Sequence, residues 1–149
     1  MLVLMKRAGV VLILILAFCG VADSAYIARQ ELAQAPLICN ETALSGCNTV
    51  ATSQYSYFLG RPVAEYGVIF YAVLFILAAL EIVAPRLILR RALQGLSFLG
   101  LLASMYLTAT EIFIIKALCI YCLASAGIAL LIFISGALIE PLRMKQKTS

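Results

Sequence analysis

ALCIYCLASAGIALLIFISGALI, residues 117–139, is the stretch that decides the fold. No Asp, Glu, Lys or Arg interrupts it, and it is long enough for the roughly 20 apolar residues that a helix needs to cross a membrane. Its side chains do not alternate between polar and apolar with a period of two, as a strand of a membrane barrel would require. The stretch therefore predicts a transmembrane helix.

Three more apolar segments precede it, at about residues 4–22, 62–83 and 92–115. The chain of 149 residues is 64% hydrophobic and only 12% charged, whereas soluble domains are about 45–50% apolar and about 25% charged. We therefore predict an all-α integral membrane protein, with residues 1–149 forming a single four-helix bundle. No continuous basic face is present to bind nucleic acid, and the absence of histidine removes the commonest metal ligand and general base.

Basic residues predict the orientation of the bundle, because they concentrate on the cytoplasmic side of membrane proteins. In a four-helix bundle, residues 84–91 and 140–149 share a side of the membrane with the N-terminus. That side carries eight basic residues: Lys6, Arg7, Arg86, Arg90, Arg91, Arg143, Lys145 and Lys147. The other side carries three: Arg29, Arg61 and Lys116. Both termini are then cytoplasmic, in a plasma or inner membrane. Residues 23–60 form an extracytoplasmic loop, which we expect to lie as short helical pieces over the helix ends.

The first apolar segment also has a second interpretation. A basic pair, a short apolar core and small residues such as Gly20 and Ala22 fit a cleavable signal peptide. In both cases the loop that follows is exported.

Four of the five cysteines fall on the exported side in this topology: Cys39, Cys47, Cys119 and Cys122. Disulfides persist outside the reducing cytosol, and four cysteines allow three pairings. Cys119 and Cys122 are three residues apart at the start of the last helix, so both lie on one face, where the helix N-terminus and Lys116 favour a thiolate. A bridge between them closes too small a loop to stabilise the chain much, which favours a redox-active dithiol.

Two other uses of these cysteines stay open. Four thiolates can bind zinc, although the seven residues between Cys39 and Cys47 exceed the short knuckles of structural zinc sites. The disulfides can also be structural, a use that suits Cys39 and Cys47 better than the closely spaced pair. The fifth cysteine, Cys19, lies within the first helix, where we expect a small buried apolar residue.

The order and spacing of these residues resemble the vitamin K epoxide reductase family. The likeness rests on Cys39-x7-Cys47-x5-Ser53, on FLGRPVAEYGVIFY at 58–71 and on CIYC at 119–122, and it runs from the extracytoplasmic loop to the last helix. It implies a four-helix bundle around a quinone, capped by that loop. It also implies that Cys119 and Cys122 face the quinone, with Cys122 the nearer. Cys39 and Cys47 would then shuttle disulfides between a thioredoxin-fold partner and Cys119.

The resemblance further implies ubiquinone, menaquinone or a related quinone as the electron acceptor, with Ser53 near it. Position at the outer helix ends adds Arg61, Tyr66, Tyr71 and Tyr121 as candidate contacts to the quinone, although such residues also serve as interfacial anchors. Since no thioredoxin domain follows the last helix, we expect the partner to be a separate exported protein. The predicted activity is that of a membrane thiol–disulfide oxidoreductase that supports disulfide bond formation.

One departure from the family bears on the substrate. Where animal members carry an asparagine and a tyrosine that contact the quinone oxygens, this chain holds Val63 or Ala64 and Ala126. This departure favours disulfide formation over the first alternative, a reductase of vitamin K epoxide or quinone. The second alternative is a non-catalytic four-helix membrane protein with structural disulfides.

Three acidic residues, Glu65, Glu81 and Glu111, lie at or near predicted helix ends. Acidic residues within a membrane are functional candidates, and quinone reduction consumes protons. Because these three can reach headgroups or water, we expect them to be interfacial.

Overall fold

The computed structural model describes residues 1–39 and 46–139, so the predicted cytoplasmic tail (140–149) and part of the predicted loop (40–45) lie outside the described residues. Four long helices dominate it: α1 (Leu2–Leu32), α3 (Val63–Val83), α4 (Leu87–Thr110) and α5 (Ile120–Ile139). A π-helical turn, η2 (Glu111–Ile115), continues α4. All four are long and apolar enough to cross a membrane. The predicted all-α membrane bundle of four helices is confirmed.

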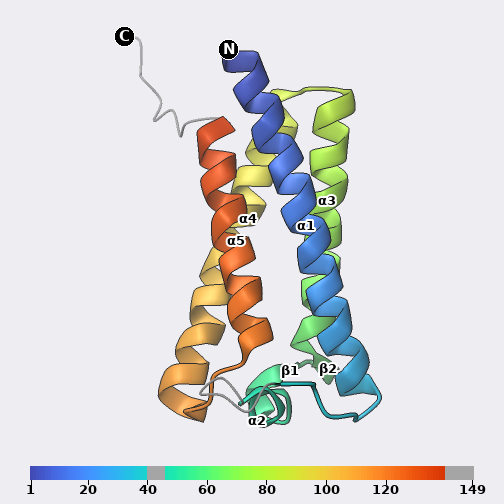
Figure 1. Cartoon of the computed structure of the whole chain (residues 1–149), viewed down its shortest axis with the longest axis vertical. Coiled ribbons are helices and arrows are strands. Elements are labelled where there is room, and N and C mark those ends of the chain that lie inside the picture. Colours follow the sequence, from blue (N-terminus) through green and yellow to red (C-terminus); the bar gives the residue numbers. More distant parts are fainter. Residues whose placement is uncertain (40–45, 140–149) are drawn as a thin grey trace.

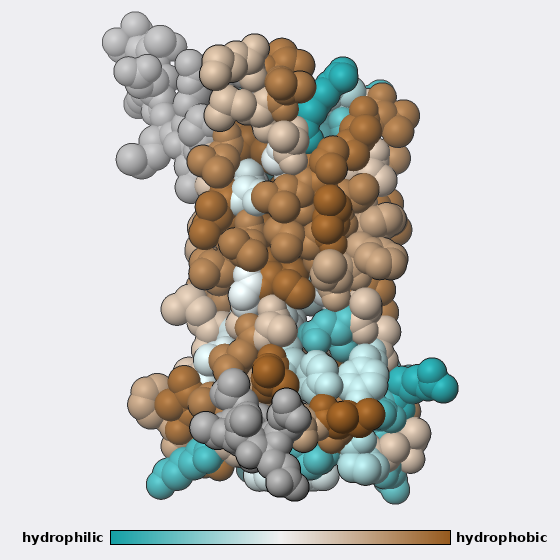
Figure 2. Space-filling model, viewed as in Figure 1, coloured by the Kyte–Doolittle hydropathy of each residue, from teal (hydrophilic) through white to brown (hydrophobic). Residues whose placement is uncertain are grey.

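The four helices form a ring, in which α1 packs against α3 and α5, and α4 packs against α5 and α3 (Figure 1). Ile13, Leu74 and Ile132, from three different helices, fill its centre with almost no exposed surface. A Cβ on Gly20 of α1 would lie 2.4 Å from the ring of Tyr71 in α3, so these two helices approach closely only because glycine stands there. The outward faces are apolar, and Figure 2 shows a broad hydrophobic belt across the bundle with hydrophilic residues gathered near its ends.

Helix α1 is longer than the predicted span of about 4–22, because it continues to Leu32. Asp23, Arg29 and Glu31 lower the hydropathy of this extension, but no glycine or proline breaks the helix after residue 22 until Pro36. The 31 residues span about 46 Å at about 1.5 Å per residue, against about 30 Å for the hydrocarbon core of a membrane. The extension therefore reaches the segment that joins α1 to α3, and the loop predicted at 23–60 is correspondingly shorter.

The start of α1, the end of α5 and the short α3–α4 connection lie at one end of the bundle (Figure 1). This connection is shorter than the predicted 84–91, because α4 begins at Leu87 and includes Arg90. Glu81 is only 3% exposed, and its carboxylate accepts hydrogen bonds from Arg90 Nε at 2.5 Å and from the Arg86 amide at 2.9 Å. The prediction of an interfacial Glu81 is therefore corrected: it is a buried ion-pair partner.

The described residues between α1 and α3, 33–39 and 46–62, lie across the other end of the bundle, and we call them the cap (Figure 1). The cap contains α2 (Cys47–Ala51), a 3₁₀ turn η1 (Gln54–Ser56), and the antiparallel strands β1 (Tyr57–Phe58) and β2 (Arg61–Pro62). The predicted short helical pieces are present as α2 and η1, whereas the hairpin was not predicted. Leu59 and Gly60 make its tight turn with positive φ angles of 52° and 78°.

Candidate functional site

Cys119 and Cys122 lie where the chain turns from α4 into α5. The widened turn η2 lets the Ala117 amide donate to the Glu111 carbonyl at 3.2 Å, and Lys116 then takes a left-handed conformation with φ of 56°. Cys119 directly precedes α5, and its carbonyl accepts a hydrogen bond of the first helical turn at 3.0 Å. Cys119 therefore caps the helix instead of lying within it, as the predicted span of 117–139 implied, and Cys122 belongs to the first turn.

The Cys119 sulfur accepts hydrogen bonds at the start of α5. The amides of Cys122 and Tyr121 donate to it, and such amides have no partner within the helix itself. The Cys122 thiol can also donate to it, although its single proton can alternatively go to the Glu111 carboxyl. The thiol hydrogen bond first, and the amides after it, lower the pKa of the Cys119 thiol, although burial and the Glu111 carboxylate oppose the shift.

The other two predicted cysteines lie directly over this turn. Cys39 and Cys47 form a disulfide in the cap, while Cys119 and Cys122 are free thiols. Cys47 begins α2 and is fully buried, in the same apolar cluster as Cys119, and Cys39 and Cys122 pack against that cluster. The structure thus brings the four cysteines together. Cys19, by contrast, is exposed on α1 instead of buried as predicted.

Gly46 allows the two cysteine pairs to approach. Its amide donates to the Leu118 carbonyl at 3.1 Å, so the residues directly before Cys47 and Cys119 are hydrogen-bonded to each other. A Cβ on Gly46 would lie 2.7 Å from the Ala117 Cβ and 2.9 Å from the Leu118 nitrogen and oxygen. Any larger residue would therefore push the cap away from the turn.

Hydrogen bonds also hold the cap immediately before its disulfide. The Asn48 amide side chain binds both backbone groups of Leu37, at 2.7 and 3.3 Å. The Tyr121 hydroxyl donates to the Ile38 carbonyl at 2.6 Å, and the Ile38 amide donates to the Tyr26 hydroxyl at 3.3 Å. The two tyrosine rings lie side by side, with centroids 5.3 Å apart. Tyr121, predicted as a quinone contact, instead fastens the cap to the CxxC turn.

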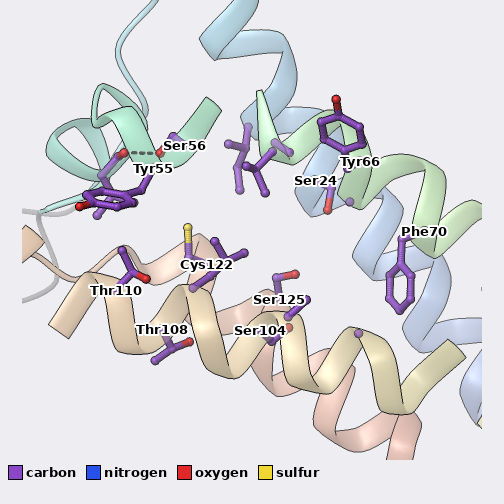
Figure 3. A pocket seen from close by; sticks show the side chains of 18 of the residues that line it. Ser24, Tyr55, Ser56, Tyr66, Phe70, Ser104, Thr108, Thr110, Cys122 and Ser125 are labelled. Carbon is purple, nitrogen blue, oxygen red and sulfur yellow. Dashed lines mark hydrogen bonds between the residues drawn. The ribbon is translucent and has the colours of Figure 1, made fainter. Parts of the chain in front are cut away.

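A cavity of about 430 Å³ lies on the other side of this turn, bounded by the long helices and the cap. Figure 3 shows the Cys122 sulfur pointing into it, with Tyr55 and Ser56 of the cap at one side. Most of the wall is aliphatic or aromatic. Hydroxyl groups line it at Ser24, Tyr55, Ser56, Tyr66, Tyr71, Ser104, Thr108, Thr110 and Ser125.

Two of the five residues predicted to contact a quinone line this cavity, namely Tyr66 and Tyr71. The Tyr71 hydroxyl donates to the Ser125 carbonyl at 2.8 Å and lies 2.8 Å from the Ser125 hydroxyl, which joins α3 to α5. The Tyr66 hydroxyl donates to the Phe58 carbonyl at 3.1 Å and so joins α3 to the hairpin. Each of these tyrosines lines the cavity, and its hydroxyl is hydrogen-bonded to a backbone carbonyl of another element.

The other three predicted contacts, Ser53, Arg61 and Tyr121, do not line the cavity. The Ser53 hydroxyl donates to the Val50 carbonyl at 2.7 Å within the cap. Arg61 forms an ion pair with Glu65 at 3.2 Å, and its side chain is 67% exposed. The hydroxyl of Tyr121 is committed to the cap. Local backbone and charge partners therefore occupy all three polar groups.

Glu111 is a site residue that the sequence analysis placed wrongly. It was predicted to be interfacial, but it is only 3% exposed and lines the cavity. Its Oε2 accepts a hydrogen bond from the Cys119 amide at 3.2 Å, and the same carboxyl group is the second acceptor within reach of the Cys122 thiol. The sequence signal for this role was one acidic residue shortly before the cysteine pair, in a run that is apolar apart from Lys116.

Comparison with known proteins agrees with this geometry. A sequence model of the vitamin K epoxide reductase family matches residues 11–136, most of the chain. A search of curated proteins finds no match. The family suggests a membrane disulfide oxidoreductase, typically one that uses a quinone, and the four membrane-length helices fit an integral membrane protein of this kind. On this match, the chain belongs to the vitamin K epoxide reductase family.

Proposed function

We propose that this protein takes electrons from an exported dithiol partner and passes them to a quinone, in support of disulfide bond formation. The observation that carries the proposal is that the CxxC pair contacts both the cap disulfide and the cavity. Cys119 packs in one buried cluster with Cys47 of the cap disulfide, whereas Cys122 lies in the wall of the cavity. The pair therefore touches a candidate electron donor on one side and a candidate acceptor site on the other.

The burial of the cysteines supports an order of exchange. Cys39 is partly exposed and Cys47 is fully buried beside Cys119, so a partner thiolate attacks Cys39 and releases Cys47. The Cys47 thiolate then attacks a Cys119–Cys122 disulfide at Cys119 and releases Cys122, because thiol–disulfide exchange proceeds through mixed disulfides. The second thiol of the partner then attacks its mixed disulfide with Cys39, which releases the oxidised partner and a free Cys39 thiolate. Attack by Cys39 on Cys47 restores the cap disulfide and leaves two thiols in the turn. The pairing in the structure matches this last state.

The cavity fits a quinone of the ubiquinone or menaquinone kind. Its volume of about 430 Å³ falls within the roughly 300–1,000 Å³ of small-molecule sites, which are mainly apolar with a few polar groups. Tyr66, Phe70 and Tyr71 would hold the ring, and the hydroxyls of Thr110 and Ser125 lie in the same wall. When bound, the quinone supplies an acceptor for two electrons and two protons.

Apolar residues in the wall support disulfide formation over reduction of vitamin K epoxide. Val63 and Ala64, at the place where animal members carry a quinone-contacting asparagine, both line the cavity. Neither has a polar side-chain group with which to bind an epoxide oxygen. We therefore keep the quinone as acceptor.

The partner and the orientation are part of the proposal. Cys39 lies in the cap, next to Ile38, which is 77% exposed, so a thioredoxin-fold protein with its own dithiol can approach from this end. Basic residues gather at the opposite end, where Lys6, Arg7 and Arg86 lie near the helix ends. By the preference of basic residues for the cytoplasmic side, that end faces the cytoplasm and the cap faces outward.

Anaerobic turnover in detergent tests the proposal. Purified protein is mixed with a reduced thioredoxin-fold dithiol protein and a soluble ubiquinone or menaquinone analogue, and the quinone absorbance is followed. We expect reduction with the wild type, none with Cys122→Ser, and a wild-type rate with the matched control Cys19→Ser, because Cys19 lies outside the cluster and the cavity wall. Equal rates for wild type and Cys122→Ser would refute the relay.

A further inference from the structure

Glu111 contacts the CxxC turn and also lines the cavity into which the Cys122 sulfur points. Glu111 is 3% exposed, and its carboxyl binds the Cys119 amide at 3.2 Å and lies within hydrogen-bonding reach of the Cys122 thiol. It also lines the cavity toward which the Cys122 sulfur points (Figure 3). Among the described residues, these contacts are to the CxxC turn and not to a lysine or arginine. An ion pair therefore does not explain why Glu111 is buried beside the CxxC turn.

The chemistry of the CxxC pair needs a proton carrier at this place. Conversion of the two thiols to a disulfide breaks two S–H bonds, forms one S–S bond, and releases two electrons and two protons. A quinone, when bound, would supply the acceptor for both electrons and both protons. Since the cavity wall is mostly apolar, a carboxyl that touches both the thiol and the cavity can carry protons across this boundary.

We propose that Glu111 is a catalytic acid–base residue that transfers the cysteine protons into the cavity; the proposal rests on the function proposed above. The carboxylate takes the proton of the Cys122 thiol, which lies within hydrogen-bonding reach, and gives it to the acceptor. Once deprotonated again, it transfers the second proton, which comes from Cys119. Such transfer by a positioned side chain contributes about 10²–10⁴-fold to a rate.

A structural role for Glu111 is separable from this one. Its hydrogen bond to the Cys119 amide holds the turn, and Gln can keep that bond because its side-chain oxygen also accepts. Gln cannot carry the proton. The variant Glu111→Gln therefore preserves the contact and removes the chemistry. Glu65→Gln is the matched control, because Glu65 pairs with exposed Arg61 and is absent from the cavity wall.

The experiment has two readouts on full-length protein in detergent. In the first, fully reduced protein is mixed with a ubiquinone analogue, and quinol formation is followed in a single turnover. We expect Glu111→Gln to be slower than wild type by about 10²-fold or more and Glu65→Gln to match wild type. Thermal unfolding of each variant checks that it is folded.

The second readout needs no quinone. Infrared difference spectra are recorded as a water-soluble phosphine reduces the oxidised protein. We expect a carboxyl band that changes on reduction in wild type and Glu65→Gln, and that is missing from both Glu111→Gln and Cys122→Ser. This change reports a carboxyl group that responds to the Cys122 thiol.

The outcomes separate the two proposals. A wild-type rate with Glu111→Gln overturns the role of Glu111 and leaves the quinone relay intact. If wild type itself reduces no quinone, the relay fails, and the infrared spectra decide Glu111 alone: a band unaffected by Glu111→Gln overturns proton exchange with Cys122.

Discussion

Gly46→Ala should uncouple the cap from the CxxC pair. The backbone of Gly46 has φ of −77° and ψ of 7°, which alanine adopts without strain, so the effect is purely steric. The new Cβ would meet the Ala117 Cβ at 2.7 Å, whereas ordinary contacts begin at 3.4 Å. The cap must therefore retreat by roughly 0.7 Å or more, and a misplacement of about 1 Å in a reacting pair can cost about 10²-fold in rate. We expect partner-to-quinone turnover to fall by about 10- to 100-fold.

The assay compares two rates for each variant. The first is steady-state electron transfer from a reduced thioredoxin-fold protein to a quinone analogue, which requires exchange between Cys47 and Cys119. The second is single-turnover oxidation of pre-reduced protein by the quinone, which requires only the CxxC pair and the cavity. Gly46→Ala should slow the first and leave the second unchanged. Gly127→Ala is the control, because nothing lies within 4 Å of a Cβ on Gly127.

Two results would contradict this reasoning. If Gly46→Ala supports the wild-type steady-state rate, close approach of the cap at this point does not control exchange. If both rates fall together, the substitution has disturbed the CxxC turn or the cavity, and the cap is not the cause.

Three further predictions concern stability, the cavity and pH. Glu81→Ala removes the carboxylate from the largely buried side chain of Arg90 and should lower the free energy of unfolding by about 2–3 kcal/mol, measured by denaturation in detergent. Gly100→Ala places a Cβ 2.2 Å from the ring of Phe70 in the cavity wall. Since overpacking costs about 1–3 kcal/mol, the displaced ring should weaken quinone binding by roughly 10-fold, measured as an increase in KM. Cys122→Ala removes the hydrogen bond that most lowers the pKa of the Cys119 thiol, whereas the hydroxyl of Cys122→Ser can keep one. The pKa should therefore rise in Cys122→Ala, and ultraviolet absorbance should detect the thiolate at higher pH than in Cys122→Ser.

The membrane bundle was predictable from the sequence because lipid leaves few options. An uninterrupted run such as 117–139 has to satisfy its backbone internally, and a helix does so within one segment. The extension of α1 to Leu32 was not predictable from hydropathy, because Asp23 and Glu31 are polar and yet compatible with a helix. Hydropathy reports where lipid begins, whereas helix length depends on the next residue that breaks the backbone pattern.

The site was predictable where it depends on spacing and not where it depends on tertiary contacts. The positions of Cys119 and Cys122 follow from their separation along a helix start. The burial of Glu111 depends on η2, and no pattern in this sequence predicts that π-helical turn. Tyr121 points to the cap because the carbonyl of Ile38 lies there, and that neighbour comes from a distant part of the chain.

Cys119 lies under the cap, and Cys122 lies in the cavity wall. This arrangement limits which molecules can exchange electrons with the pair. On the proposed function, reductant enters only through a molecule that reaches Cys39, and it leaves only to a molecule that fits the cavity. The dithiol then transfers electrons in pairs from thiols in water to quinones in the lipid, and only by this route. These pools stay kinetically insulated from each other although a single protein joins them. Any change that opened a direct path from the cap to the cavity would let thiols in water reach the quinone directly, although every cysteine would be unaltered.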